Sequence, residues 1–267
     1  MKVLFIGDIV GSPGRRIVHD RLADLVEQRG IDLVIANGEN SASGFGITPR
    51  IVEELLSLNI ATISGGNHSW DRKEIMEFMP HEPRLLRPAN FPDPNPGSGL
   101  YVGTASNGVK FAVLNLQGRV FLPAIDDPFK KADELLEKLP SSVEFVLVDM
   151  HAETTSEKIA LGWYLDGRVT AVVGTHTHVT TADERVLPNG TAYITDVGMT
   201  GPHDGVIGME RSGVLKKFID ALPSRFEVAT GDVQLNAVLI ETDDSLPRNE
   251  PGRLRAKSIE RVRLRTD

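Results

Sequence analysis

The sequence predicts an α/β fold with a parallel β-sheet at its centre, and two features of the chain support this. Near the N-terminus, short apolar runs with β-strand character alternate three times with segments whose apolar residues recur at helical spacing. Such strand–helix alternation is typical of parallel sheets. The chain of 267 residues is also long enough to bury a substantial core, and we expect one domain over residues 1–267.

The three N-terminal units have recognisable starts and ends. The first helix is expected to begin at Ser12, as its N-cap, and to stop at Gly30. Thr48 would cap the second helix, and a third helical pattern begins near Arg72. The strands that precede these helices are predicted at 3–6, 33–36 and 60–63. After the third strand, Gly65 and Gly66 would let the backbone turn sharply, with dihedral angles that other residues resist.

The remainder of the chain mixes hairpins with further helices. Asn107-Gly108 is a typical hairpin turn and would join two strands of an antiparallel pair. Strands are predicted at 100–102, 111–114, 145–148, 170–173, 192–194, 226–228 and 233–240, with a last one inside 253–265. Helices are predicted at 127–139, from about 156, and at 210–222.

Composition excludes several classes of function. The chain has no cysteine, which removes disulfides, thiolate nucleophiles and cysteine-ligated metals. The net charge of −8 argues against a large nucleic-acid surface, which is usually basic. No apolar run is long enough to cross a bilayer and the N-terminus leads directly into a strand, so we expect a cytoplasmic protein without a membrane partner.

Polar side chains that suit metal ions follow successive predicted strands. They are Asp8, Glu39 with Asn40, Asn67 with His68, His151, and His176 with His178. Each alone has an ordinary explanation, because Asp and Asn are common in turns and caps and a single His is usually a polar loop residue. Five such strand ends at one edge of a sheet, where α/β proteins bind ligands, favour a metal site. An extended backbone would also place the imidazoles of His176 and His178 on one side.

These motifs carry a family resemblance. The order Gly-Asp-Ile-Val-Gly, Asn-Gly-Glu-Asn, Gly-Asn-His-Ser-Trp-Asp, His-Ala-Glu-Thr-Thr-Ser-Glu and Gly-Thr-His-Thr-His resembles the calcineurin-like binuclear metallophosphoesterases. It is closest to their YmdB-like bacterial branch, over nearly the whole chain. Val10 stands where the wider superfamily has a ligating His, and Glu39 where it has a bridging Asp. The YmdB-like branch shares both changes, with Asn40 in place of the missing His.

The resemblance implies a fold and a metal centre. The fold is a four-layer α/β/β/α sandwich of two mixed β-sheets. Two divalent ions, which could be Fe, Mn or Zn, would share Glu39. The other implied ligands are Asp8, Asn40 and His178 for one ion, and Asn67, His151 and His176 for the second. A hydroxide shared by the ions would attack phosphorus, and His68 would act as general acid or contact the phosphoryl oxygens.

The function implied is that of a metal-dependent phosphoric diester hydrolase. Its substrates would be small phosphodiesters, 2′,3′-cyclic nucleotides such as 2′,3′-cAMP among them. Three alternatives stay open: a phosphomonoesterase, a regulatory protein that binds metal and phosphate with little turnover, and a metal hydrolase that cleaves another bond. A homo-oligomeric assembly also stays open.

Overall fold

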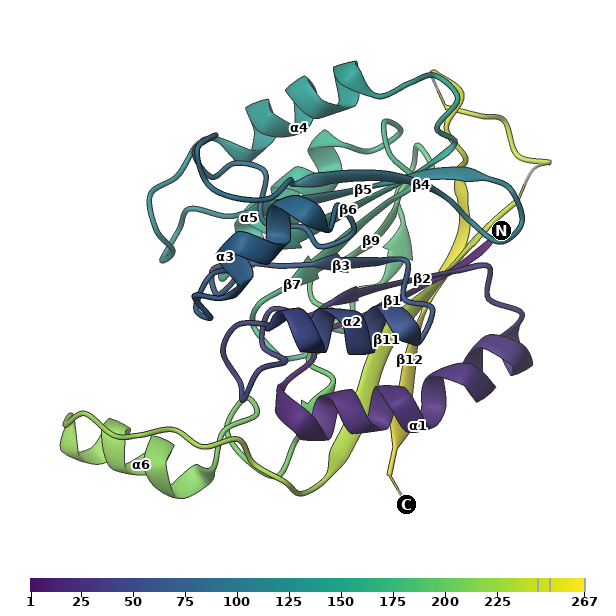
Figure 1. Ribbon diagram of the computed structural model, residues 1–267. Coiled ribbons are helices and arrows are strands. Elements are labelled where there is room, and N and C mark those ends of the chain that lie inside the picture. Colours follow the sequence, from purple (N-terminus) through teal and green to yellow (C-terminus); the bar gives the residue numbers. More distant parts are fainter. Residues whose placement is uncertain (244, 250, 267) are drawn as a thin grey trace.

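A computed structural model shows two mixed β-sheets packed face to face, with helices on both outer faces (Figure 1). It describes residues 1–243, 245–249 and 251–266; Asp267, at which the predicted domain ends, lies outside the described residues. Helices α1 (Gly11–Arg29) and α2 (Pro49–Ser57) cover one sheet, and α4 (Pro128–Lys138) and α5 (Thr155–Tyr164) cover the other. The predicted four-layer α/β/β/α arrangement is therefore confirmed.

The first sheet combines a parallel centre with antiparallel strands from the C-terminal part of the chain. β1 pairs in parallel with β2, which pairs in parallel with β3, while β11 joins the other edge of β1 in antiparallel orientation. β12 and the short β10 both pair with β11. The bounds are β1 Lys2–Ile6, β2 Leu33–Asn37, β3 Thr62–Ser64, β10 Gly201–Pro202, β11 Val233–Thr242 and β12 Ala256–Arg265.

The second sheet has the order β4-β5-β6-β7-β9-β8. Its four central strands are parallel, and the predicted hairpin at Asn107-Gly108 joins β4 to β5 in antiparallel orientation. The bounds are β4 Leu100–Thr104, β5 Lys110–Gln117, β6 Phe145–His151, β7 Ala171–Thr175, β8 Arg185–Val186 and β9 Ala192–Ile194. Parallel strands buried on both faces are expected to be continuously apolar, as β6 and β7 largely are.

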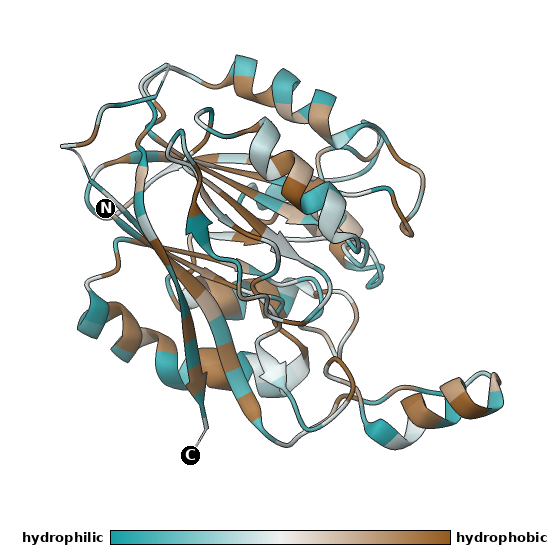
Figure 2. Cartoon of the chain, turned by 180° about the vertical axis from the view of Figure 1, so that it is seen from behind, coloured by the Kyte–Doolittle hydropathy of each residue, from teal (hydrophilic) through white to brown (hydrophobic). Residues whose placement is uncertain are grey.

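Apolar side chains between the sheets hold the layers together. Phe5 and Ile35 from the first sheet pack with Val113, Leu147 and Val173 from the second, and all five are buried. Colouring by hydropathy shows mainly apolar central strands, with polar and apolar residues alternating along the helices (Figure 2). Because this packing fixes one sheet against the other, it also fixes the strand ends that carry the polar motifs.

Most helices begin and end near the residues predicted from the sequence. Two predictions differ from the structure. The side chain of Thr48 accepts a hydrogen bond from the backbone of Ile51, and Gly30 ends α1 in the left-handed conformation. Ser12 is not the N-cap of α1, because the helix already begins at Gly11. The helix predicted near Arg72 is a single turn, α3, which spans Ile75–Phe78 and leads into a 3₁₀ turn at Met79–His81.

The segment after β10 differs most from the prediction. Residues 226–228 form no strand, and only an isolated bridge joins Val228 to Met209. Helix α6 (Arg211–Asp220) projects from the body of the molecule (Figure 1). Among the described residues, no helix is long and apolar enough to cross a membrane.

Candidate metal centre

The seven predicted ligands come from the carboxyl ends of strands in both sheets. Asp8 follows β1, Glu39 and Asn40 follow β2, and Asn67 follows β3. In the second sheet, His151 is the last residue of β6, and His176 and His178 follow β7. The sheets therefore meet at one polar cluster, which we call the seven-residue centre.

His151 lies at the middle of the tightest part of this centre. Its Nε2 atom is 3.0 Å from Oε1 of Glu39, 3.0 Å from Oδ1 of Asn67 and 3.0 Å from Nδ1 of His176. One ligand atom from each of Glu39, His151 and His176 lies within 4.8 Å of the others. Such converging oxygen and imidazole donors are a common arrangement for a first-row divalent metal.

The other predicted ligands adjoin this group through Glu39 and His176. Nδ2 of Asn40 is 3.1 Å from Nε2 of His178 and 3.3 Å from Oε1 of Glu39. The backbone N–H of His176 lies 3.3 Å from both carboxylate oxygens of Asp8. Asn40 and His151 thus both contact Oε1 of Glu39, and they in turn contact His178 and Asn67.

The donor set fits a divalent cation. Asp8 and Glu39 are buried, and no Lys or Arg side chain in the described part of the chain pairs with either carboxylate. The cationic partner of Glu39 is His151, and only while its imidazole is protonated, whereas a buried carboxylate with no positive partner is unfavourable by several kcal/mol. A bound cation would supply that charge.

Charge coupling inside the centre is strong. Burial alone would raise the pKa of Glu39, but the charge and hydrogen bond of His151 lower it to about 2. Burial opposes protonation of His151, yet the Glu39 carboxylate raises its pKa to about 9. Burial and repulsion from His151 lower the pKa of His176 to about 3. A metal ion would replace the proton on His151, because imidazoles bind metals in their neutral form.

Gly66 is needed at the centre for space. A Cβ atom on Gly66 would lie 2.3 Å from Oε2 of Glu39 and 2.3 Å from Nε2 of His151. Neither Gly65 nor Gly66 has a positive φ, so the prediction of unusual dihedral angles there is wrong. Close packing of the backbone against Glu39 and His151 explains why no side chain fits at Gly66.

A buried carboxylate that the sequence analysis did not single out fixes His151. Asp149 accepts hydrogen bonds from the hydroxyls of Ser64 and Thr175 and from the amide of Asn37. Oγ1 of Thr175 also lies 2.9 Å from Nδ1 of His151. When Thr175 donates to Asp149, it accepts from Nδ1–H, which leaves Nε2 free to bind a metal. Burial raises the pKa of Asp149 to about 6.

A second support, also missed, holds the loop after β7. Lys158 on α5 donates to Oδ2 of Asp196 at 2.6 Å, and both side chains are buried. Asp196 accepts from the backbone and hydroxyl of Thr177, the residue between the two loop histidines. The φ angles of His176 and His178 are 97° and 66°, so the backbone is not extended here, and the condition under which the two imidazoles would share one side is not met. This twist directs His176 toward His151 and His178 toward Asn40.

His68 borders the centre without joining it. Its backbone N–H donates to Oε2 of Glu39, and Nδ1 lies 2.7 Å from Oδ2 of Asp71. The edge of the ring packs against Phe45, at 5.2 Å between centroids. Asp71 is therefore the orienting partner of His68, a role that the turn motif alone did not reveal. With Nδ1–H donated to Asp71, Nε2 is the nitrogen left to exchange a proton.

Comparisons with known proteins agree over the length of the chain. The model of the YmdB-like protein family matches residues 4–260. The 2′,3′-cyclic-nucleotide 2′-phosphodiesterase of Bacillus subtilis (strain 168) is 51% identical over 268 residues, covering 100% of this chain and 98% of that protein.

Solved structures share the fold. The crystal structure of a hypothetical protein from Thermus thermophilus has a TM-score of 0.90 at 40% identity and covers 100% of both chains. That of a novel phosphatase from Mycoplasma pneumoniae has a TM-score of 0.90 at 36% identity and covers 99% of this chain and 93% of its own.

Proposed function

The chain belongs to the YmdB-like protein family, and we propose that it is a metal-dependent phosphodiesterase whose substrates include 2′,3′-cyclic nucleotides. The observation that carries this proposal is the seven-residue centre, in which amide and imidazole groups from both sheets gather around Glu39 and His151. The name of the Bacillus subtilis relative supports the choice of substrate.

The proposed centre holds two divalent ions, Fe, Mn or Zn, with Glu39 as their shared ligand. Asp8, Asn40 and His178 would complete one set of protein ligands, and Asn67, His151 and His176 the other. Two such ions would stabilise negative charge on the phosphoryl oxygens and make a water molecule a strong nucleophile at neutral pH. Asp149 and Thr175 keep His151 in the tautomer that this arrangement needs.

His68 supplies the proton in the proposed reaction. As water adds to phosphorus, the P–O bond to a ribose oxygen breaks, and that oxygen leaves as an alkoxide that needs a proton. Nε2 of His68 would donate it, while Asp71 keeps the ring oriented. The product is an opened phosphomonoester, and the proton taken from water restores His68.

The charges near the centre favour a diester over a monoester. The two cations closest in sequence to the motifs are both engaged, since Arg72 donates to the carbonyls of Phe45 and Ala42 and Lys158 to Asp196. A monoester dianion therefore lacks a guanidinium or ammonium clamp at these motifs, whereas a diester carries a single negative charge that the metal ions can balance.

A substrate comparison tests this proposal. With saturating manganese, we expect kcat/KM to be higher for 2′,3′-cAMP and for bis(4-nitrophenyl) phosphate than for 4-nitrophenyl phosphate. Higher activity on the monoester would contradict the diesterase assignment and favour a phosphomonoesterase. Activity on the aryl diester alone would contradict the nucleotide assignment, and binding of phosphate without turnover of any ester would favour the regulatory alternative.

A homo-oligomer is part of the same proposal, because α6 exposes an apolar stripe. Leu215, Phe218 and Ile219 follow the i, i+3, i+4 spacing of one helix face, and Phe218 and Ile219 are 81% and 78% exposed. Leu222, also exposed, lies just beyond the end of the helix. Adjacent exposed apolar side chains of this size are more than isolated surface residues explain. A specific contact between two copies would need to bury on the order of 1,000 Å² in total.

The occupant of this stripe that fits best is α6 of a second copy. In an antiparallel pair, Phe218 meets Ile219 of the partner helix. The contact is isologous, which is the usual form of dimer interface.

Sedimentation velocity tests the α6 contact. We expect the protein to be a dimer or larger assembly at micromolar concentration, and the double variant Phe218→Ser with Ile219→Ser to be a monomer. Phe121→Ser is the matched control, because Phe121 is 87% exposed but lies outside α6. A monomeric wild-type protein, or a double variant that still associates, would contradict the proposed contact.

A further inference from the structure

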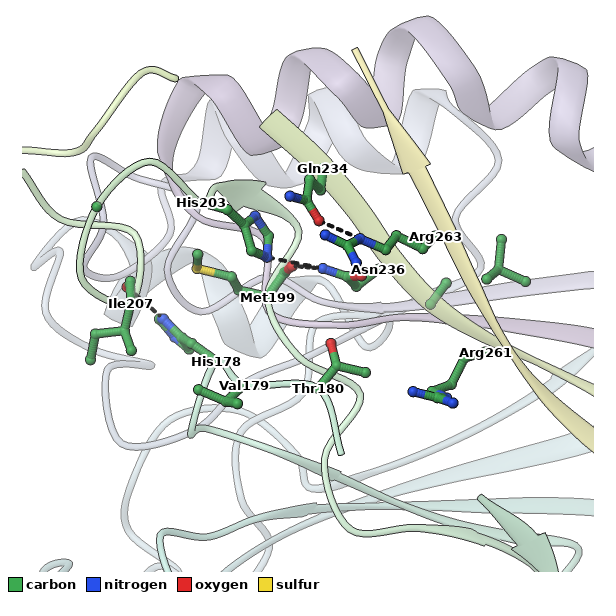
Figure 3. Close-up of a pocket in the computed structure, with 13 residues that line it drawn as sticks. His178, Val179, Thr180, Met199, His203, Ile207, Gln234, Asn236, Arg261 and Arg263 are labelled. Carbon is green, nitrogen blue, oxygen red and sulfur yellow. Dashed lines mark hydrogen bonds between the residues drawn. The ribbon is translucent and has the colours of Figure 1, made fainter. Parts of the chain in front are cut away.

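A cavity of about 380 Å³ lies beside His178, on the side of the first sheet (Figure 3). The loops that follow β7 and β10 line it together with the ends of β11 and β12. Because His178 belongs to both the seven-residue centre and the cavity wall, a molecule bound at the centre can extend into the cavity. This space is not used by the reaction described above.

Arg263, on β12, offers this cavity a positive charge. Its Nε atom donates to Oε1 of Gln234 at 2.6 Å, and Gln234 in turn donates to Asp232. The guanidinium is thereby oriented by a neutral amide. No hydrogen bond within the described part of the chain uses either terminal nitrogen of Arg263, so both are available for a ligand.

The neighbouring arginines of β12, unlike Arg263, each lie close to a carboxylate. Arg261 forms an ion pair with Glu184 at 2.8 Å, and Arg265 lies 3.9 Å from a carboxylate oxygen of Asp232. Successive odd-numbered residues of a strand share one face, so the three arginines have similar surroundings but different partners. Of these three, Arg263 is the one without a directly contacting carboxylate in the described structure.

Two further polar groups of the cavity, Asn236 and His203, are fixed and neutral. Asn236 donates both amide hydrogens, to the carbonyl of Met199 and to Nε2 of His203. The Nδ1–H of His203 donates to the carbonyl of Gly201, and burial lowers the pKa of His203. The cavity thus combines the oriented guanidinium of Arg263 with apolar walls such as Val179 and Val262.

We propose that this cavity is a second anion subsite, in which Arg263 binds the phosphate on the 5′ side of the nucleoside whose cyclic phosphate lies at the metal centre. The inference rests on the proposed function. A guanidinium with two free terminal nitrogens matches phosphate in a bidentate geometry. The cavity lining contains no Phe, Tyr or Trp among the described residues on which a nucleobase could stack, which favours phosphate over base as the group bound there.

The preferred substrate is therefore a nucleotide with two phosphates. One is the 2′,3′-cyclic phosphate that reacts, and the other is either a free 5′-phosphate or the phosphodiester that links the last nucleotide to the rest of an RNA fragment. In a protein of net charge −8, a substrate with this second negative charge gains from a dedicated cation.

Steady-state kinetics with three substrates test this subsite. They are 2′,3′-cAMP, 5′-phosphoadenosine 2′,3′-cyclic phosphate, and the dinucleotide ApA with a terminal 2′,3′-cyclic phosphate. We expect the wild-type protein to show about tenfold or more higher kcat/KM when the 5′ phosphate group is present, the gain typical of a hydrogen bond between charged groups. An advantage for the free 5′-phosphate alone would assign the subsite to mononucleotides, and an advantage for the dinucleotide as well would assign it to RNA ends.

Two variants locate the effect. In Arg263→Gln, the ratio of kcat/KM between the 5′-phosphorylated and unphosphorylated substrates is expected to fall to about one. Arg265→Gln, on the same strand face but outside the cavity lining, is expected to keep the wild-type ratio. A wild-type ratio near one, or an unchanged ratio in Arg263→Gln, would overturn the subsite while leaving the phosphodiesterase intact. Failure to hydrolyse any of the three cyclic phosphates would overturn the proposed function and the subsite with it.

Discussion

Glu39→Gln is expected to give a folded protein that binds neither metal ion at wild-type affinity and has no measurable phosphodiesterase activity. Glu39 is the proposed shared ligand, and its carboxylate contacts Asn40 and His151, which are assigned to different ions in the proposal. The substitution preserves shape and leaves an oxygen to accept the N–H of His68, but it removes the negative charge that two cations would share. The fold should survive, because the sheets are held together by apolar packing.

Metal analysis of protein purified without chelators, circular dichroism and kcat/KM together measure this effect. Glu153→Gln is the matched control, since Oε2 of Glu153 lies 3.1 Å from Nε2 of His176 but Glu153 is half exposed and outside the proposed ligand set. We expect this control to retain both ions. A Glu39→Gln protein that kept both ions at wild-type affinity would show that Glu39 is not the bridge.

His68→Ala is expected to separate binding from chemistry. The variant should retain its metal ions, because His68 contacts the centre through its backbone N–H, which alanine keeps. Turnover of 2′,3′-cAMP should fall by about 10²–10⁴-fold, the usual contribution of general acid catalysis. The fall should be much smaller for an aryl diester, whose phenolate leaving group needs little protonation.

Comparison of the two substrates in wild type, His68→Ala and Asp71→Asn measures this difference. Asp71→Asn retains the imidazole and should show a smaller loss than His68→Ala, with the same dependence on the leaving group. An equal loss for both substrates in His68→Ala would restrict His68 to orienting the phosphoryl group.

Much of the fold follows from local sequence signals. The apolar runs, the caps at Thr48 and Gly30 and the hairpin turn identify most elements, and the motifs identify the family. The two-residue strands β8 and β10 could not be predicted, because they exist only through pairing with β9 and β11. The helical pattern that begins near Arg72 predicted a longer helix than the single turn of α3 that forms, because a local pattern does not show how many turns tertiary packing will stabilise.

The supports of the centre were harder to predict than its proposed ligands. The ligands stand at strand ends, where polar residues interrupt the apolar runs. Asp149 lies inside strand β6, Lys158 inside helix α5, and Asp196 just beyond β9, so local pattern gives no reason to connect them. One feature of the sequence could have identified Asp149: it is a charged residue directly after an apolar run, inside what proves to be a fully buried strand. The positive φ angles at His176 and His178 arise from tertiary contacts that the sequence does not express.

The long separation between contacting residues has a consequence during translation. Asp8 meets the backbone of His176 across 168 positions, Asn40 meets His178 across 138, and β1 pairs with β11 near the C-terminal end. At about 5–20 residues per second, the interval between synthesis of Asn40 and of His178 is on the order of ten seconds. The seven-residue centre therefore cannot form on the ribosome before His178 has emerged, and the pairing of β1 with β11 must wait until residues 237–241 have followed.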